Sequence, residues 1–286
     1  PVDDAIDTTA FGRSLYRGHL FWFQHFLPYV PITDIYPNNK NNIQGQRLVS
    51  PLEIYFDPNI RGIYNQNPNF LDSNDVGYYD PNNAFSSKPE NRKRIWGGFT
   101  RLLSSFNTNF DTENIEYIEI MMNILDNNQG EGKMYIDLGQ ISEDLIPNGR
   151  LDTEDGFTKA SPFPNGIIDA GEDVGIDQLN DDQEKEAYPF PLNQEPDPAR
   201  DDYYFDFGKR DDARTISDFY KYNNFENNSK YSEMGQFPDK EVLNDNNGQT
   251  LQLSNDYFTY EVNLTPDPNN NPQIVGGNPA KGWYLF

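Results

Sequence analysis

The chain contains no cysteine, only two histidines, and 22 basic residues against 46 acidic ones, which gives a net charge of −24. The absence of cysteine excludes disulfide bonds and thiol chemistry, although it does not fix the cellular compartment. His19 and His25 are too few and too poorly spaced for a histidine metal site, so we interpret each as a surface or packing residue. The negative charge repels phosphate backbones and argues against nucleic acid as a partner.

Long apolar runs are also missing. The most apolar stretch, residues 19–30, is interrupted by polar residues and Pro28, and it is shorter than the roughly 20 residues of a membrane helix. Transmembrane β-strands need only about 9 to 11 residues, so the sequence leaves such strands open. The chain starts at Pro1 without a leader segment, and we expect it to be the interior of a longer polypeptide.

Catalytic motifs are absent as well. The sequence has no G-x-S-x-G, no P-loop, no G-x-G-x-x-G and no H-E-x-x-H. Among 46 acidic residues, some pair will have the separation of glycosidase carboxylates by chance, so that pattern is not specific. Trp22, Trp96 and Trp283 could line a sugar platform but are more typical of a β-sheet core or rim. We therefore expect no enzyme.

Aromatic residues are abundant, with 18 Tyr and 20 Phe, alongside 21 Pro and 21 Gly. This composition predicts ordered β-structure with long polar loops rather than disorder. Alternating or apolar patterns predict strands within residues 16–30, 46–57, 95–106, 255–264 and 282–286. Leu48, Leu52, Ile54 and Phe56 would share one face of the strand within 46–57, and Phe258, Tyr260, Val262 and Leu264 would point inward from the strand at 255–264. The Gly97-Gly98 pair indicates a bulge or a close backbone approach.

Residues 114–144 read as the centre of the fold. Ile118, Ile120 and Met122 would share one face of a first strand, and Met134, Ile136 and Leu138 one face of a second. The polar residues 127–132 supply a turn between them, which predicts a β-hairpin.

These elements predict an all-β protein, an antiparallel β-sandwich of the jelly-roll kind with long acidic loops. Residues 1–94 would hold flanking strands and an Asn- and Tyr-rich surface loop at 58–94. Residues 95–286 would form the sandwich core, interrupted by an acidic insertion at 144–212.

A short repeat lies inside this acidic insertion. The sequence PNGRLD at residues 147–152 recurs as PNGIID at 164–169, and more acidic residues follow each copy. Calcium binding uses such patterns, because Ca²⁺ takes six to eight oxygen ligands and glycine allows the sharp turn that gathers them. In EF-hand numbering Asp144 and Asp155 fit the ends of the first loop, while Ser161 and Phe163 stand at the start of the second. The candidate Ca²⁺ ligands are Asn148, Asp152, Asp155, Asn165, Asp169 and Glu172.

Two plainer interpretations stay open for the repeat. An Asn-Gly pair followed by a leucine or β-branched residue is also a turn into a short strand. Acidic runs more often form a solvated surface than a specific cation site.

Longer motifs carry a family resemblance. In order along the chain they are WGGFTRLLSSFNTNFDTENIEYIEI (96–120), MYIDLGQISEDLIPNGR (134–150), EDVGIDQLNDDQE (172–184), YNNFENNS (222–229), FPDKEVLNDNNGQTL (237–251) and NDYFTYEVNL (255–264). Upstream stand YRGHLFWFQHFLPYV (16–30), TDIYPN (33–38) and YFDPNIRGIYN (55–65). Over residues 14–286 the chain resembles the SprA family, the giant outer-membrane translocons of type 9 secretion, also called gliding motility proteins.

The resemblance implies a protein-secretion role. Members of this family close a barrel of about 36 strands through which folded cargo leaves the cell. A chain of 286 residues is too short for that barrel, so it would be a soluble domain on the extracellular side of the outer membrane. Its implied partners are the rest of the translocon barrel, cap or plug proteins of the secretion system, and secreted cargo. The alternative is a calcium-dependent cell-surface adhesin or carbohydrate-binding module.

Overall fold

The computed structural model describes residues 10–24, 29–37, 48–70, 89–102, 116–124, 132–156, 165, 168–169, 171–227, 241–243 and 251–286. Strands predominate over helices, and every strand pair with a defined register is antiparallel, so the predicted strand-rich, antiparallel class is confirmed. The chain divides into two compact units, and each takes segments from both sides of residue 94. Unit 1 comprises residues 1–23, 53–101 and 142–253; unit 2 comprises residues 24–52, 102–141 and 254–286.

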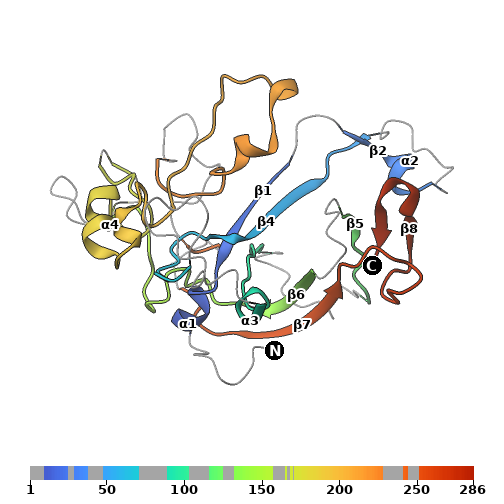
Figure 1. The fold of residues 1–286 in the computed structure, drawn as a ribbon, viewed down its shortest axis with the longest axis horizontal. Helices are drawn as coiled ribbons and strands as arrows, with labels where there is room; N and C mark the ends of the chain where they lie inside the picture. Colours follow the sequence, from blue (N-terminus) through green and yellow to red (C-terminus); the bar gives the residue numbers. More distant parts are fainter. Residues whose placement is uncertain are drawn as a thin grey trace. The chain divides into compact units, whose positions relative to one another are not determined.

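Unit 1 is built around two long paired strands, β1 and β4 (Figure 1). Its strands and helices are α1 (Ala10–Ser14), β1 (Gly18–Gln24), β4 (Leu52–Arg61), α3 (Pro89–Arg92), α4 (Asp181–Ala187) and the 3₁₀ helices η1 (Leu192–Gln194), η2 (Asp211–Ala213) and η3 (Ile216–Phe219). The strands predicted within 16–30 and 46–57 are thus present as β1 and β4, with the short β3 preceding β4.

An aromatic core covers one face of this strand pair. Phe21 and Phe23 of β1 are buried against Tyr203, Phe205 and Phe219, which come from the C-terminal end of the acidic segment and from η3. The rings of Phe23 and Phe219 stack with centroids 3.7 Å apart. Close-packed aromatic side chains bury large areas, so this contact anchors the acidic segment to β1.

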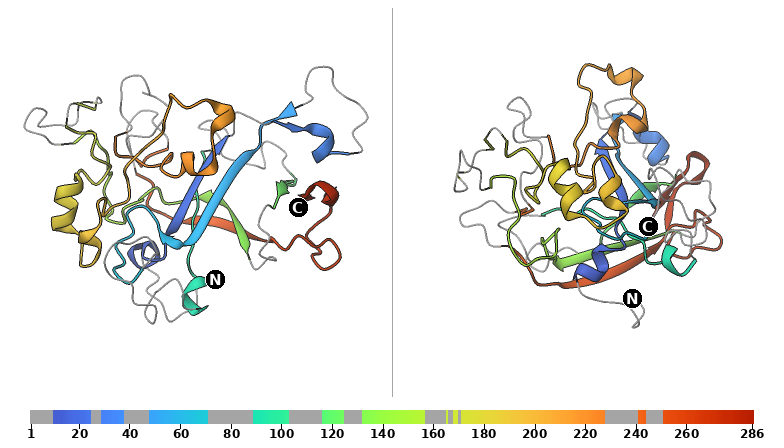
Figure 2. Two further views of the ribbon diagram at one scale, coloured as in Figure 1. Left: turned by 45° about the horizontal axis from the view of Figure 1, so that its top comes forward. Right: turned by 60° about the vertical axis from the view of Figure 1, so that its left-hand side comes forward.

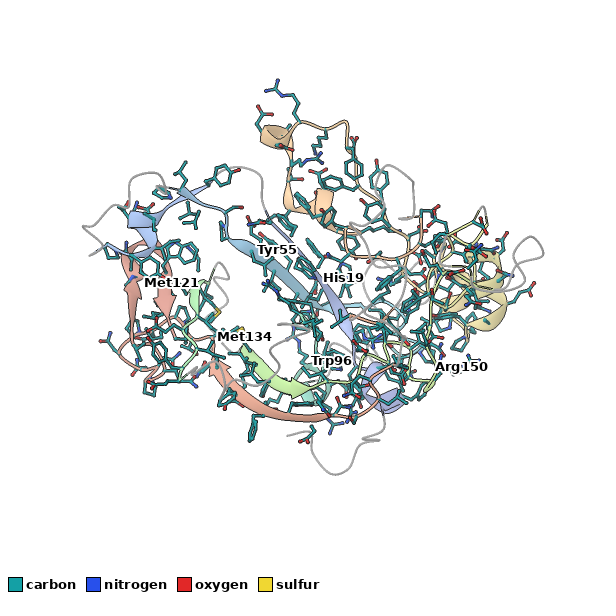
Figure 3. The ribbon with its side chains drawn as sticks, turned by 180° about the vertical axis from the view of Figure 1, so that it is seen from behind. His19, Tyr55, Trp96, Met121, Met134 and Arg150 are labelled. Atoms are coloured by element: carbon teal, nitrogen blue, oxygen red, sulfur yellow. The ribbon has the colours of Figure 1, made fainter. Side chains whose placement is uncertain are left out.

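His19 belongs to the same core. Its ring lies 4.2 Å from that of Tyr220 and its Nε2 lies 3.1 Å from the Tyr220 carbonyl oxygen. Figure 3 labels His19 on β1 and Tyr55 on β4, which stacks on Phe21. The interpretation of His19 as a packing residue is confirmed, whereas His25 lies outside the described residues.

The apolar face predicted for β4 is not the face that is buried. Its alternation has the right period, but Leu52, Ile54 and Phe56 are exposed, as is Leu48 of β3, and Tyr55 packs inward instead. The reason is the partner surface: residues 203–222 offer aromatic rings to the Tyr55 face.

The strand predicted at 95–106 is also wrong over its described part. Trp96 forms only an isolated bridge with Arg17, and residues 97–102 are irregular. The expected close backbone approach is present, because a Cβ on Gly97 would lie 2.7 Å from the Phe56 ring and 2.8 Å from Leu20. The prediction for residues 103–106 falls outside the described residues.

The end of β4 leads into a second core rather than a surface loop. Tyr64, Asn65 and Phe70 are buried, which corrects the loop expected from residue 58 onward. Tyr64 packs with Ile176 and Tyr188 of the acidic segment, together with Leu192 and Ala199. An unpaired buried amide is unfavourable, and the Asn65 side chain is satisfied by the carbonyl oxygens of residues 15 and 17.

Arg61, the last residue of β4, has a fully buried side chain. Its Nη1 donates to the Asn65 carbonyl oxygen at 2.6 Å, and its Nη2 donates to Glu195 Oε2 at 2.8 Å and to the Pro198 carbonyl oxygen at 2.7 Å. Arg200 Nε donates to the same Glu195 oxygen at 3.1 Å. This network fixes the 195–200 turn to the end of β4.

The described residues of unit 2 form three small sheets. The longest strand pair among them, residues 133–140 beside residues 256–263, can be followed in Figure 2. Its elements are β2 (Val30–Pro31), α2 (Ile32–Ile35), β3 (Leu48–Val49), β5 (Met121–Asn123), β6 (Lys133–Gln140), β7 (Asp256–Asn263), β8 (Gly276–Asn278), the 3₁₀ helix η4 (Pro279–Lys281) and β9 (Trp283–Leu285). Strand β2 pairs with β3, β6 pairs with β7, and β9 lies between β5 and β8.

The predicted hairpin is wrong in its pairing; its second strand is present as β6, but its first is present only as the short β5, and Ile118 and Ile120 lie outside a strand. Strand β5 pairs with β9, from Met121 opposite Leu285 to Asn123 opposite Trp283. Strand β6 pairs with β7 over eight residues, from Lys133 opposite Asn263 to Gln140 opposite Asp256. A loop of several polar residues does not fix a register, so the long β6–β7 ladder decides the pairing.

The strand predicted at 255–264 is confirmed as β7, and that at 282–286 as β9. The predicted inward face of β7 is wrong for its aromatic residues. Val262 is buried, but Phe258 and Tyr260 are exposed by 76% and 54%. On the other face, Glu261 accepts from Lys133 Nζ at 2.6 Å and from the Tyr135 hydroxyl at 3.1 Å.

Candidate metal centre

The first PNG loop is closed by a set of side-chain to backbone hydrogen bonds. Asp144 accepts the Asn148 N–H at 3.1 Å and the Gly149 N–H at 3.0 Å. Asn148 Nδ2 donates to Asp152 Oδ2 at 2.7 Å, and the Asp152 N–H donates to Glu241 Oε1 at 3.0 Å. Gly149 has φ of 73°, a conformation that glycine adopts without strain. Figure 3 labels Arg150, which follows this turn.

The second PNG loop repeats the arrangement. Asp155 Oδ1 accepts the Asn165 N–H at 2.9 Å, and Asn165 Nδ2 donates to Asp169 Oδ2 at 2.9 Å. The Asp169 N–H donates to Glu172 Oε2 at 2.7 Å. Glu172 is almost fully buried, and its other carboxylate oxygen makes no hydrogen bond.

Each loop therefore uses an acid, an asparagine, an aspartate and a glutamate in the same order of contacts. This assignment corrects the predicted roles of two residues. Asp155 was placed at the end of the first loop, but it opens the second loop, where Ser161 was expected; Ser161 lies outside the described residues. In the first loop Glu241 accepts the N–H of the aspartate, as Glu172 does in the second loop. The local sequence does not indicate this role, because Glu241 lies 89 residues beyond Asp152.

The first loop gathers its carboxylates closely enough for a cation. One oxygen each from Asp144, Asp152 and Glu241 lies within 4.8 Å of the others. Burial raises the pKa of Glu241 to about 7 and also raises the pKa of Asp152. A bound Ca²⁺ would offset that desolvation, because it prefers hard carboxylate oxygens.

The second loop is less complete. Among the residues that the structure describes, its carboxylates do not converge into a comparable group. Two of the six candidate ligands, Asn148 and Asp152, belong to the first PNG loop. The other four belong to the second PNG loop: Asp155, Asn165, Asp169 and Glu172.

The aromatic residues considered for a sugar platform have separate environments. Trp283 is buried in β9, whereas Trp96 donates through Nε1 to the Arg13 carbonyl oxygen. Trp22 is 37% exposed and lies 5.6 Å from the Phe99 ring, so these two could form a small stacking surface.

Comparisons with known proteins add no family. A scan against protein-family models finds no match, and a search of curated proteins finds none. No helix in the described part of the chain combines the length and apolar content needed to cross a membrane. The chemistry of the two loops thus follows from their geometry alone.

Proposed function

We propose that this chain is a calcium-binding, non-catalytic structural segment of an outer-membrane translocon of type 9 secretion. The observation that carries the calcium part is the duplicated hydrogen-bond arrangement of the two PNG loops in unit 1. The placement in a translocon is supported by the ordered series of motifs over residues 14–286.

The proposed segment lies on the extracellular side of the outer membrane and supports protein export and gliding motility. Its partners are the rest of the translocon barrel, cap or plug proteins, and exiting cargo. Exposed rings such as Phe190 and Tyr204, at 66% and 67%, supply adhesive area for these partners. The net charge of −24 keeps such a surface soluble. A jelly-roll sandwich, as the finer description of the strand-rich fold, is part of the same proposal.

Calcium at the first loop is tested by thermal unfolding. About 1 mM Ca²⁺ should raise the thermal midpoint relative to EDTA, because a ligand that binds only the folded state stabilises it. Glu241→Gln should reduce that rise, since it replaces a converging carboxylate with a neutral amide. Asp212→Asn, an exposed acid paired with Arg210, is the matched control and should leave the rise unchanged. Equal midpoints with and without Ca²⁺ would refute the calcium assignment.

The translocon assignment is tested by blotting outer-membrane fractions of the source bacterium with antibody to this chain, before and after protease treatment of intact cells. A band far larger than the 33.0 kDa of this chain, clipped by the external protease, supports the proposal. A soluble band near 33.0 kDa contradicts it.

A second candidate function is a calcium-dependent adhesin or carbohydrate-binding module. The exposed Trp22 beside Phe99 favours it, because such ring pairs stack on sugars. A glycan-dependent change in tryptophan fluorescence that Trp22→Ala abolishes would support this candidate. If no glycan of a panel changes the fluorescence, this candidate is contradicted.

A further inference from the structure

Unit 1 holds a second acidic group that shares no residue with the PNG loops. We call it the carboxylate cluster; its seven members are Asp177, Asp181, Glu184, Asp197, Asp201, Asp202 and Glu226. Lys221 is the basic residue that forms ion pairs with it, at 3.1 Å to Asp197 and 2.9 Å to Asp202. Seven carboxylates against one ammonium leave a large uncompensated charge in a confined volume.

Four places in the chain bring these residues together, and the first of them is Asp177, which precedes helix α4. Helix α4 begins with an Asn180–Gln183 capping box, and its first turn presents Asp181 and Glu184 on one face. The 197–202 turn lies across that face, where Glu184 Oε2 accepts the Ala199 N–H at 2.8 Å. Residue 226 joins through its N–H, which donates to the Asp201 carbonyl oxygen at 2.7 Å.

The cluster consists of three overlapping groups, in each of which one oxygen per residue lies within 4.8 Å of the others. The groups are Asp177, Glu184 and Asp201; Asp181, Glu184 and Asp197; and Asp181, Asp202 and Glu226. Glu184 is shared by the first two groups and Asp181 by the last two. A carboxylate has two oxygens and can bridge neighbouring cations, so this overlap is the geometry of a row of adjacent cation positions.

Buried oxygens of the cluster lack hydrogen-bond donors. Glu184 and Asp201 are fully buried, yet Glu184 Oε1 and both carboxylate oxygens of Asp201 make no hydrogen bond of standard geometry, although the Tyr64 hydroxyl is near Asp201. Asp181 Oδ1 and Glu226 Oε2 are buried without partners in the same way. A buried ionised oxygen without a partner is strongly unfavourable, so these atoms are neutralised either by a proton or by a bound cation.

A glycine with positive φ, Gly175, lies against the carboxylate of Asp201. Gly175 has φ of 80°, and a Cβ there would collide with Asp201 Oδ2. Burial, followed by repulsion from neighbouring carboxylates, raises the pKa of Asp201 well above its usual range. The same causes raise the pKa of Glu184 to about 8 and that of Glu226 to about 9.

We propose that the carboxylate cluster binds two Ca²⁺ ions, one at Asp177, Glu184 and Asp201 and the other at Asp181, Asp202 and Glu226. Asp197 lies between them, in the group that links the two positions. Two divalent ions offset most of the cluster's charge, whereas one would leave most of it uncompensated. Among the described residues, the metal-ligating groups that converge here are carboxylates, which favours Ca²⁺ over metals that select nitrogen or sulfur ligands. The two ions would link helix α4 to the 197–202 turn and to residue 226.

The test counts bound Ca²⁺ on the full chain by isothermal titration calorimetry after chelation. Glu184→Gln keeps the size of the side chain and an acceptor for Ala199 but removes a charged ligand of the first position, so it should lose the ion at Asp177, Glu184 and Asp201 and lower the number of cluster ions from two to one. Glu241→Gln at the first PNG loop should retain both cluster ions, which separates this proposal from the proposed function. Asp212→Asn is the control for a lost surface charge. A Glu184→Gln protein with the wild-type number of bound ions would overturn the proposal.

If Glu184→Gln does not fold, Tb³⁺ luminescence in the Glu241→Gln background gives a second measurement. Tyr64 and Tyr188 surround Asp201 and should sensitise Tb³⁺ bound in the cluster. Ca²⁺ should then displace the emission at a lower concentration than Mg²⁺, which prefers to keep its waters. Absence of Ca²⁺-displaceable emission, or equal displacement by Mg²⁺, would refute the assignment.

Discussion

Arg61→Ala should be among the most destabilising single substitutions in unit 1. The guanidinium is fully buried and donates to one carboxylate, that of Glu195, and to two backbone carbonyl oxygens. Its removal takes this donor from the two buried carbonyl oxygens and takes one of its cations from Glu195. It also removes the contact that holds the 195–200 turn against β4.

The loss of unfolding free energy in Arg61→Ala depends on which partners Glu195 keeps. Breaking a buried ion pair typically costs about 3–5 kcal/mol, because the surviving charge is left uncompensated. Glu195 keeps one cation, since Arg200 Nε lies 3.1 Å from the same oxygen. We therefore expect a loss near the lower end, about 3 kcal/mol, which lowers the thermal midpoint by roughly 5 °C in a chain of this length.

Circular dichroism melts of the wild type and variant, with urea unfolding to obtain the free energy, measure this effect. Arg210→Ala is the matched control, because its pair with Asp212 is exposed and should contribute less than about 1 kcal/mol. Equal destabilisation by Arg61→Ala and Arg210→Ala would refute the reasoning.

Three further predictions follow from other features. Cysteines introduced at Ile136 and Tyr260 should form a disulfide on mild oxidation, because these residues are directly opposite in the β6–β7 ladder and the chain has no other cysteine. Gly175→Ala should lower the thermal midpoint sharply, since it combines a positive φ with a collision against a carboxylate. Hydrogen bonds from Lys209, then from Thr215, lower the pKa of Asp218 to about 2. Its contribution to stability should therefore be fully present above pH 3.8 and be lost as the pH falls through about 2, which acid unfolding of Asp218→Asn against wild type measures.

Each has its own control. A cysteine pair at Met122 and Ile136, as a β5–β6 hairpin would require, should stay reduced; its efficient oxidation would restore the hairpin. Gly171→Ala has a similar positive φ but open space around the new Cβ, so it should be milder than the change at 175. A constant difference between Asp218→Asn and wild type from pH 5 to about 2 would contradict the assigned pKa.

Strand positions were predictable where the local pattern decides them. β1, β4, β6, β7 and β9 all coincide with alternating or apolar runs, because that alternation is a property of a few adjacent residues. Pairing was not predictable in the same way. β6 meets a strand more than a hundred residues away, and nothing within residues 114–144 carries that information. Burial of a face likewise depends on the surface that arrives opposite it, as Tyr55 shows.

In the candidate site, too, the sequence indicates the contacts that are local and not those that depend on the fold. The two PNG loops were visible as a repeat, since their contacts from asparagine to aspartate span four residues. The part played by Glu241 was not visible in the sequence, because only the folded chain brings it next to Asp152. The carboxylate cluster was hidden for a further reason: in a chain with 46 acidic residues, no single Asp or Glu is distinctive until the fold buries it.

The central place of β9 in its sheet has a consequence for the order of synthesis. β5 and β6 are translated long before their partners, which the chain reaches only at residues 256–263 and 283–285. At usual elongation rates the gap lasts on the order of ten seconds. During that time both strands present unpaired backbone edges, which are prone to join other extended chains. The β6–β7 sheet and the β5–β9–β8 sheet of unit 2 can therefore form only late, and a chaperone that recognises extended strands would have time to bind β5 and β6 first.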